Sequence, residues 1–247
     1  MKISVVTASY NSEATIGFTI ESFLKQSHSE KEMLVIDGAS SDATVKIAES
    51  FGSVAIRVFS EKDKGVYDAM NKGFHLFQGD AVGFLNSDDT FHDAGVLSEI
   101  AAAMKDADIV YGDLNMVTDH LTKRVFRSWR GGALRRHAFQ LGWVPPHPTF
   151  YVRKEVAERV GDYDLRYITT ADYDYMLRAI ALNNYRVHYL PRVMVDFQIG
   201  GISTRGLGVT IRGNLECLRS RREHLHAPPI DAAFFLRFAR RIFQIRA

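Results

Sequence analysis

The strongest constraint on the fold is an alternation, in the first half of the chain, between two kinds of apolar pattern. Short apolar runs rich in β-branched residues have the composition of buried strands. Between them, apolar residues recur every three or four positions, as on one face of an amphipathic helix. This alternation predicts βαβ units, and hence a Rossmann-like α/β fold with a mostly parallel central sheet flanked by helices. The expected strands cover residues 3–7, 33–36, 54–59, 81–85 and 109–111.

Composition limits the classes of protein that the chain can represent. Its 247 residues suit one α/β domain with extra terminal helices, and a hydrophobic content of 46% excludes a disordered chain. Lysine and arginine total 31 against 29 acidic residues, a net charge of +2, which argues against a nucleic-acid-binding protein. The single cysteine, Cys217, excludes an intrachain disulfide. The polar N-terminus and the lack of a long apolar stretch lead us to expect a cytoplasmic protein.

The second half of the chain has a more irregular pattern. We expect strands over residues 149–152 and 193–197 and a helix over residues 172–182. Two further helices, interrupted at Pro228-Pro229, are expected to form a C-terminal helical extension.

Polar sequence follows three of the expected strands, at the point where each strand ends. These segments are Thr7 to Asn11, Asp37 to Asp42 and Asn86 to Asp89. In open α/β sheets, ligands bind beyond the carboxyl ends of the strands, where these segments would meet. The sequence therefore predicts one polar crevice at this edge of the sheet.

Asp88 and Asp89 form an acidic pair directly after an apolar strand. Adjacent carboxylates are costly there unless water, a helix N-terminus or a cation stabilises them. A hard cation such as Mg²⁺ or Mn²⁺ takes one or two carboxylates together with phosphate oxygens of a substrate. Seen alone, the pair fits helix capping as well as it fits a metal site.

Six motifs follow one another along the chain, and their order and spacing are more specific than any one of them. In this order and spacing the chain resembles the family 2 glycosyltransferases, inverting enzymes with the GT-A fold that act in bacterial polysaccharide assembly. The resemblance extends over residues 2–201. The motifs occupy residues 5–11, 35–44, 63–73, 86–89, 147–150 and 171–174.

The resemblance implies a binding site for a nucleotide-sugar donor. Asp37 would accept a hydrogen bond from the N3–H of uracil, which favours a UDP-sugar; it also fits an Asx turn with Gly38. Asp89 would coordinate a divalent cation, Mn²⁺ or Mg²⁺, although Asn86 replaces the aspartate that is commoner in the family. The residues expected to bind the nucleotide sugar on this basis are Thr7, Ala8, Tyr10, Asn11, Asp37, Asp63, Lys64 and Asp88. Arg205 could also donate to the diphosphate from the glycine-rich segment 198–205, for which a simple turn is the alternative.

Asp172 matches the catalytic base of the family. Inversion by direct displacement needs one carboxylate near the acceptor hydroxyl and no enzyme nucleophile. Ala171 stands where the family usually has glutamate, and Asp172 could alternatively cap its helix. His147 and Trp129 are candidates for contact with the acceptor, a saccharide or lipid-linked saccharide; a structural role fits His147 equally well.

The resemblance also divides the chain into functional parts. A GT-A domain over residues 1–204 would bind the nucleotide sugar through residues 1–115 and the acceptor through residues 116–204. The extension would cover residues 205–247. Two other functions fit parts of the pattern. One is a nucleotide-sugar-binding protein without turnover, and the other is a sugar nucleotidyltransferase, although the phosphate loop typical of the latter class is missing.

The C-terminal segment from Asp231 to Arg246 has the pattern of a basic amphipathic helix. Such a helix can lie on an anionic membrane surface, here the inner face of the cytoplasmic membrane. Packing on its own domain or in a homodimer is the alternative. Its aromatic and aliphatic side are Phe234, Phe238, Ile242 and Ile245, and its basic side contains Arg237, Arg240 and Arg241.

Overall fold

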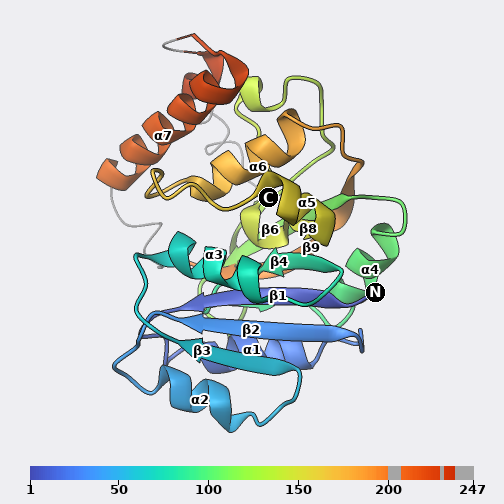
Figure 1. Cartoon of the computed structure of the whole chain (residues 1–247), viewed down its shortest axis with the longest axis vertical. Coiled ribbons are helices and arrows are strands. Elements are labelled where there is room, and N and C mark those ends of the chain that lie inside the picture. Colours follow the sequence, from blue (N-terminus) through green and yellow to red (C-terminus); the bar gives the residue numbers. More distant parts are fainter. Residues whose placement is uncertain (200–206, 229–230, 237–247) are drawn as a thin grey trace.

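The structure is a computed structural model, and it describes residues 1–199, 207–228 and 231–236. In this part of the chain one nine-stranded sheet has the strand order β3-β2-β1-β4-β8-β6-β9-β5, with β7 paired to β6 (Figure 1). Its strands are β1 (Ile3–Ser9), β2 (Lys31–Asp37), β3 (Ile56–Ser60), β4 (Ala81–Phe84), β5 (Asp89–Phe91), β6 (Ile109–Val117), β7 (Val125–Trp129), β8 (Tyr151–Arg153) and β9 (Val187–Gln198).

Helices cover both faces of this sheet. On β1, Val6 faces a hydrophobic cluster that includes residues of α3, α5 and α6, whereas Val5 faces a second cluster with residues of α1, α2 and α4. Successive side chains of a strand point to opposite faces, so one buried strand serves both clusters. The helices are α1 (Ile16–Leu24), α2 (Thr44–Ser50), α3 (Val66–Leu76), α4 (Val96–Ala103), α5 (Lys154–Val160), α6 (Ala171–Ala181) and α7 (Leu207–Leu225), with the short 3-10 helices η1 (Phe139–Leu141) and η2 (His147–Thr149).

The first four strands are parallel, as the alternation in the sequence predicts. Their register aligns Ser9 with Asp37 and Asp37 with Ser60, so the carboxyl ends of β1, β2 and β3 lie level. The second half adds mixed pairing: β8 is antiparallel to both β4 and β6, whereas β9 is parallel to β6. The α/β, Rossmann-like architecture with helices on both faces is therefore confirmed, with antiparallel pairs concentrated beyond β4.

Some element boundaries differ from those expected. The first helix begins at Ile16, because residues 13–15 form a turn that precedes it. In the 3-10 helix η2, Thr149 occupies a position that we expected to start a strand. Helix α5 was not foreseen at all.

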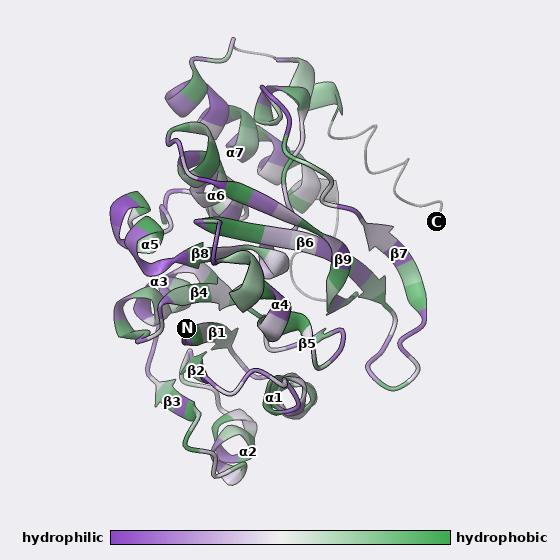
Figure 2. Ribbon diagram, turned by 90° about the vertical axis from the view of Figure 1, so that its right-hand side faces the viewer, coloured by the Kyte–Doolittle hydropathy of each residue, from purple (hydrophilic) through white to green (hydrophobic). Residues whose placement is uncertain are grey.

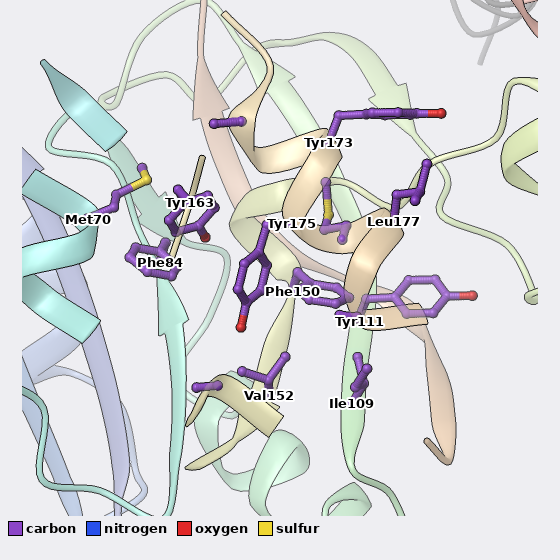
Figure 3. Close-up of a cluster of buried hydrophobic side chains, with 14 of the residues drawn as sticks. Met70, Phe84, Ile109, Tyr111, Phe150, Val152, Tyr163, Tyr173, Tyr175 and Leu177 are labelled. Atoms are coloured by element: carbon purple, nitrogen blue, oxygen red, sulfur yellow. The ribbon is translucent and has the colours of Figure 1, made fainter. Parts of the chain in front are cut away.

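An aromatic cluster fills the space between α3, α6 and the sheet (Figure 3). The ring of Tyr163 lies 5.4 Å from Phe84 of β4 and 4.8 Å from Tyr175 of α6, measured between centroids. Such offset and edge-on arrangements stabilise aromatic pairs beyond the burial of their area. The cluster therefore holds α6 at a defined place above the carboxyl end of β4.

Helix α7 mixes hydrophilic and hydrophobic residues and packs on α6 (Figure 2). Its Arg221 is fully buried, where the guanidinium donates to the Asp231 carboxylate at 2.6 and 2.8 Å and to the Tyr173 hydroxyl at 3.0 Å. These contacts attach residues 231–236 to the domain. No helix in the described ranges is long and apolar enough to cross a membrane. The basic stretch from residue 237 onward lies outside the described residues.

Candidate functional site

The loops that follow β1, β2 and β4 meet at the carboxyl edge of the sheet. The backbone N–H of Asn11 donates to the Ser40 hydroxyl at 2.8 Å. The hydroxyls of Ser12 and Ser87 lie 2.9 Å apart. Side-chain hydrogen bonds thus join all three polar segments, and this edge is where ligands bind in open α/β sheets.

Asp37 is fully buried at the centre of this edge. One carboxylate oxygen accepts hydrogen bonds from the Ser9 and Ser40 hydroxyls at 3.2 and 2.5 Å. The other accepts from the Ser40 N–H at 2.9 Å and the Ser60 hydroxyl at 2.7 Å. Asp37 therefore joins the ends of three strands, and both of its oxygens already have partners.

Asp63 lies beside Gly38 and is more exposed than Asp37. Its Oδ1 accepts a hydrogen bond from the Gly65 N–H at 2.8 Å. A Cβ at position 38 would lie 2.6 Å from Asp63 Oδ2, so only glycine there leaves room for this carboxylate. The absence of a side chain at Gly38 thus lets the Asp63 carboxylate lie against the backbone directly after Asp37.

The other residues assigned to the nucleotide differ in accessibility. Thr7 is fully buried, and within the described part of the chain its hydroxyl has no hydrogen-bond partner. Tyr10 is 64% exposed, and Lys64 is also exposed. The side chains of Tyr10 and Lys64 are therefore accessible to a ligand. The buried Thr7 instead forms part of β1, below these exposed side chains. Arg205 lies outside the described residues.

Asp88 and Asp89 differ in burial although they are adjacent. Asp88 is partly exposed, whereas Asp89 is fully buried at the start of β5. Asp89 accepts hydrogen bonds from the Asn86 side-chain amide at 2.7 Å and from the Gln198 N–H at 3.0 Å. Burial raises the pKa of both carboxyls, and the charge of Asp88 raises the pKa of Asp89 further.

A cation would best offset the unfavourable free energy of holding two adjacent carboxylates, one of them fully buried, in their charged form. The hard oxygen donors of Asp88 and Asp89 suit Mg²⁺ or Mn²⁺. In the part of the chain that the structure describes, no three His, Cys, Asp or Glu side chains form a cluster that could hold a metal. A cation here would thus need ligands from a diphosphate and water in addition to the pair.

Asp172 lies in the first turn of α6 and is partly exposed. Its Oδ1 accepts hydrogen bonds from the Tyr67 hydroxyl at 3.1 Å and from the Tyr173 N–H at 2.8 Å. Tyr67 belongs to α3, which begins directly after Gly65. The contact between Tyr67 and Asp172 therefore links α3, the helix that follows the Asp63 loop, to the carboxylate on α6.

His147 lies between the acidic motif and α6. Its ring stacks on Phe84, the last residue of β4, with a centroid distance of 5.5 Å. Its Nε2 lies 2.9 Å from the Tyr163 hydroxyl. Burial lowers the pKa of His147, and the charge of Asp172 opposes this shift only in part. A neutral, mostly buried ring fits the structural role, and contact with an acceptor stays a prediction.

Trp129 is the last residue of β7, paired with Leu114 of β6. Its partly buried ring packs against the hydrophobic cluster on the side of α1 and α4. The geometry thus supports a packing role for Trp129 and leaves its contact with an acceptor a prediction.

Two polar residues of α3, Asn71 and Asp68, position neighbouring segments of the chain. Asn71 bonds to the backbone of Tyr163 through both ends of its amide, with distances of 3.0 and 2.8 Å. Asp68 accepts from the Lys64 N–H at 2.9 Å and so holds the preceding loop. A polar residue within the apolar stripe of α3 was the available signal for Asn71, but its partner lies 92 positions away.

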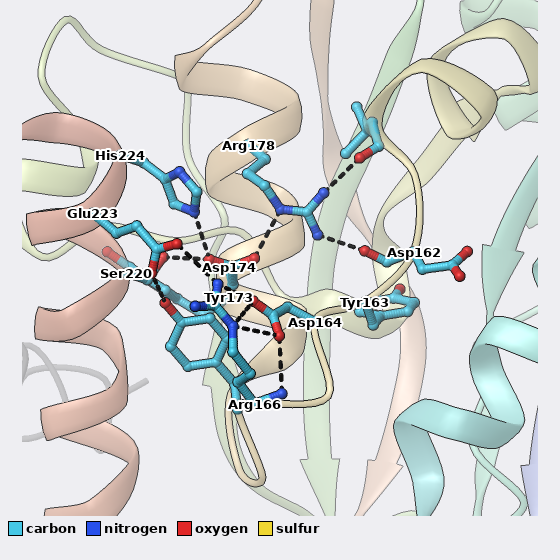
Figure 4. Close-up of polar contacts among 12 residues, drawn as sticks. Asp162, Tyr163, Asp164, Arg166, Tyr173, Asp174, Arg178, Ser220, Glu223 and His224 are labelled. Atoms are coloured by element: carbon cyan, nitrogen blue, oxygen red, sulfur yellow. Dashed lines mark hydrogen bonds and ion pairs between the residues drawn. The ribbon is translucent and has the colours of Figure 1, made fainter.

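Asp174 was expected to form an ordinary helical pair with Arg178. The structure shows that the carboxylate is buried and also accepts hydrogen bonds from α7 (Figure 4). Its partners are Arg178 Nε at 2.8 Å, the Ser220 hydroxyl at 2.8 Å and His224 Nε2 at 3.0 Å. Asp174 therefore connects α6, the helix that contains Asp172, with α7.

The Rossmann-like half, with an acidic pair after β4, and the second half, with a carboxylate at the start of α6, together have the architecture of the GT-A fold. The chain belongs to glycosyl transferase family 2, whose family model matches residues 4–161. The matched range ends before Asp172, so the position of this residue rests on the structure and on the motif around it.

Curated relatives and solved structures agree with this membership. The chain is 31% identical over 209 residues to a PGL/p-HBAD biosynthesis glycosyltransferase of Mycobacterium bovis, covering 81% of this chain and 78% of the relative. Over 90 residues it is 39% identical to the putative teichuronic acid biosynthesis glycosyltransferase TuaG of Bacillus subtilis, covering 35% and 36%.

Two solved structures share the fold. S. aureus TarS 1–349 in complex with UDP matches with a TM-score of 0.67 and 19% identity, covering 94% of this chain and 68% of that TarS fragment. The mannosyltransferase PcManGT from Pyrobaculum calidifontis, in complex with GDP-Man and Mn²⁺, matches with a TM-score of 0.66 and 17% identity, covering 98% and 69%.

Proposed function

We propose that this glycosyltransferase moves a sugar from a nucleotide-diphosphate donor to a hydroxyl of a saccharide or lipid-linked saccharide, with inversion at the anomeric carbon. The observation that carries the proposal is the contact between Asp172 and Tyr67. It places a partly exposed carboxylate beside the helix that follows the nucleotide loop. A base at that position can act on an acceptor next to the bound donor.

Asp172 is proposed to act as the general base. Its carboxylate takes the proton of the acceptor hydroxyl while the acceptor oxygen bonds to the anomeric carbon and the diphosphate leaves. A single displacement inverts the configuration and needs no covalent enzyme intermediate.

Asp88 and Asp89 are proposed to hold Mn²⁺ or Mg²⁺ on the donor side. When bound, such a cation neutralises charge on the leaving diphosphate. The partly exposed Asp88 would contact the cation and the donor directly. The buried Asp89 would bind the cation from the inner side or orient Asp88. Burial raises the pKa of both carboxyls, and a nearby cation would stabilise the ionised form that burial disfavours.

A uridine nucleotide is the proposed donor base. A carboxylate suits the single N3–H of uracil, and two carboxylates, Asp37 and Asp63, lie at this end of the site. Because serines and a backbone N–H occupy both oxygens of Asp37, we assign the direct contact to Asp63 and the support of the loop to Asp37. The TarS complex contains UDP and the PcManGT complex contains GDP-Man, so the shared fold accommodates either base.

The acceptor is proposed to belong to cell-surface glycolipid or polysaccharide assembly. The support is the pair of relatives named for PGL/p-HBAD biosynthesis and teichuronic acid biosynthesis. We further propose that the basic segment after residue 236 brings the enzyme reversibly to the cytoplasmic face of the membrane, where a lipid-linked acceptor would be held.

Product analysis tests the proposed reaction against its alternatives. With Mn²⁺, a panel of UDP- and GDP-sugars and saccharide acceptors, we expect release of the nucleoside diphosphate and a product of inverted anomeric configuration by NMR. Release of pyrophosphate would identify a nucleotidyltransferase instead. Binding without turnover for every pair tested would favour a nucleotide-sugar-binding protein.

A further inference from the structure

We propose that Tyr67 is a positioning residue for Asp172, which selects the carboxylate oxygen that faces the acceptor and keeps a hydrogen-bond partner throughout proton transfer. This inference rests on the proposed function of Asp172 as the base. It concerns a tyrosine whose hydroxyl need not touch either substrate.

The hydroxyl of Tyr67 has two acceptors within hydrogen-bond distance. It lies 3.1 Å from Asp172 Oδ1 and 3.0 Å from the carbonyl oxygen of Thr169. The hydroxyl carries one proton, so it can donate fully to only one of the two at a time. Both acceptors lie on one segment, at and just before the first turn of α6.

The two oxygens of Asp172 are therefore unequal. Oδ1 is occupied by Tyr67 and by the N–H of Tyr173 at 2.8 Å. In the described part of the chain, Oδ2 has no hydrogen-bond partner, so it is the oxygen available to an acceptor hydroxyl. Rotation of the carboxylate would break both contacts of Oδ1, which gives the base a defined orientation.

The second acceptor of Tyr67 is itself held in place by α7. Glu216 accepts hydrogen bonds from the N–H groups of Thr169 and Thr170 at 2.9 and 3.0 Å. Thr169 therefore presents its carbonyl from a fixed position. The C-terminal helix thus contributes to the geometry of the base without reaching the site.

This arrangement suits both charge states of the base. While Asp172 is ionised, Tyr67 donates to Oδ1. When Oδ2 has taken the proton of the acceptor hydroxyl, Oδ1 is a weaker acceptor and the Tyr67 hydroxyl can turn to Thr169. The tyrosine keeps its own proton throughout, and no buried polar group loses its partner.

The surroundings keep Tyr67 in its donor form. Burial, with the charge of Asp172, raises the pKa of Tyr67 well above its usual value. Its ring packs on Tyr163 with a centroid distance of 5.7 Å. The titratable groups that face Asp172 and Tyr67 are His147 from η2, Tyr163 from the loop before α6, and Cys217 from α7.

The test compares Tyr67→Phe with a matched control on the same helix as the base. Tyr175 belongs to the same aromatic cluster as Tyr67 and is more deeply buried, but within the described residues its hydroxyl has no hydrogen-bond partner. Tyr67→Phe should lower kcat about 10-fold or more, as expected for one lost hydrogen bond to a charged group, with the KM for the donor unchanged. Tyr175→Phe should leave kcat and KM unchanged.

The pH dependence separates positioning from a loss of stability. Removing a hydrogen bond to the charged form of a carboxyl disfavours that form, so the acid limb of kcat/KM should move to higher pH in Tyr67→Phe. Site-specific 3-fluorotyrosine at position 67 keeps the ring and makes the hydroxyl a stronger donor. It should move the same limb to lower pH.

Two outcomes would overturn the inference, and they differ from a failure of the proposed function. The first is a folded Tyr67→Phe enzyme with wild-type kcat and pH profile, while Asp172→Asn is inactive. The second is a 3-fluorotyrosine enzyme whose acid limb does not move. If Asp172→Asn itself retained turnover, the proposed base would be wrong, and the role of Tyr67 would be rejected with it.

Discussion

Asp88 and Asp89 are adjacent in the chain, but the first is partly exposed and the second is fully buried. The difference arises because Asp89 is the first residue of β5 and pairs with Phe197 of β9. Its side chain is directed inward, where Asn86 and the backbone of Gln198 donate to it. Asp88 is therefore accessible from solvent, whereas Asp89 is enclosed with its hydrogen-bond partners.

The first prediction concerns this pair. Both Asp88→Asn and Asp89→Asn should weaken Mn²⁺-dependent donor binding, by about 10–100-fold for the buried position. Calorimetric titration of UDP with and without Mn²⁺ measures this effect. The isosteric changes preserve the hydrogen bond from Gln198 to position 89. Unaltered metal affinity in both variants, or full activity in excess chelator, would exclude the pair as a cation site.

The second prediction concerns the base. Asp172→Asn should reduce kcat by about 10²–10⁴-fold, because the base acts on the acceptor in the transition state. Donor affinity should change little, since the proposed base acts on the acceptor and not on the donor. Single-turnover kinetics and donor titration separate the two effects. A folded variant with near-normal turnover would refute the assignment.

The third prediction concerns the nucleobase. UDP should bind more tightly than GDP, and Asp63→Ala should weaken UDP binding about 10-fold by removing one charged hydrogen-bond acceptor. Asp37→Ala should instead lower the melting temperature, because three serine hydroxyls lose their common partner. Calorimetry and thermal unfolding of both variants check this division. Tighter binding of GDP would reverse the expected preference.

The fourth prediction concerns the buried ion pair of Arg221 and Asp231. Arg221→Met should cost about 3–5 kcal/mol of unfolding free energy, because it leaves a buried carboxylate unpaired. Burial of the Asp231 carboxylate by itself would raise its pKa, but the ion pair with Arg221 lowers the pKa below its usual value. The pair therefore stabilises the fold above the unfolded-state pKa of Asp231, and this stability is lost as the pH falls through the folded-state pKa.

Urea unfolding at neutral and acidic pH measures this effect. The double variant Arg221→Met with Asp231→Leu should recover much of the loss at neutral pH, since it leaves no buried charge. Equal stability of wild type and Arg221→Met at neutral pH would contradict the role of the pair.

The fifth prediction concerns membrane contact. Removal of residues 237–247 should abolish co-sedimentation with anionic liposomes at low salt, while the Arg221–Asp231 pair stays intact. Three arginines near an anionic surface contribute about 1 kcal/mol each, so binding should be reversible and salt-sensitive. Equal sedimentation of the intact and shortened proteins, or none for either, would favour packing or dimerisation of this segment.

The sequence was sufficient to predict that the first four strands are parallel and that polar segments follow three of them. Both follow from local patterns, since a buried strand and an amphipathic helix can be recognised within a few residues. The polar segments after β1, β2 and β4 had to meet once the strands were parallel. The acidic pair could likewise be placed at the site from its position after a strand.

Only the tertiary structure decided what each site carboxylate can do. In the sequence, four aspartates appear simply as polar residues near strand ends: Asp37, Asp63, Asp88 and Asp89. Their burial and hydrogen bonds distinguish the aspartates with a structural role from those that a ligand can reach. The contact between Tyr67 and Asp172 joins residues 105 positions apart. Local patterns determine elements because neighbouring residues share one helix face or strand, whereas the partner of a buried polar group depends on the packing of elements distant in the chain.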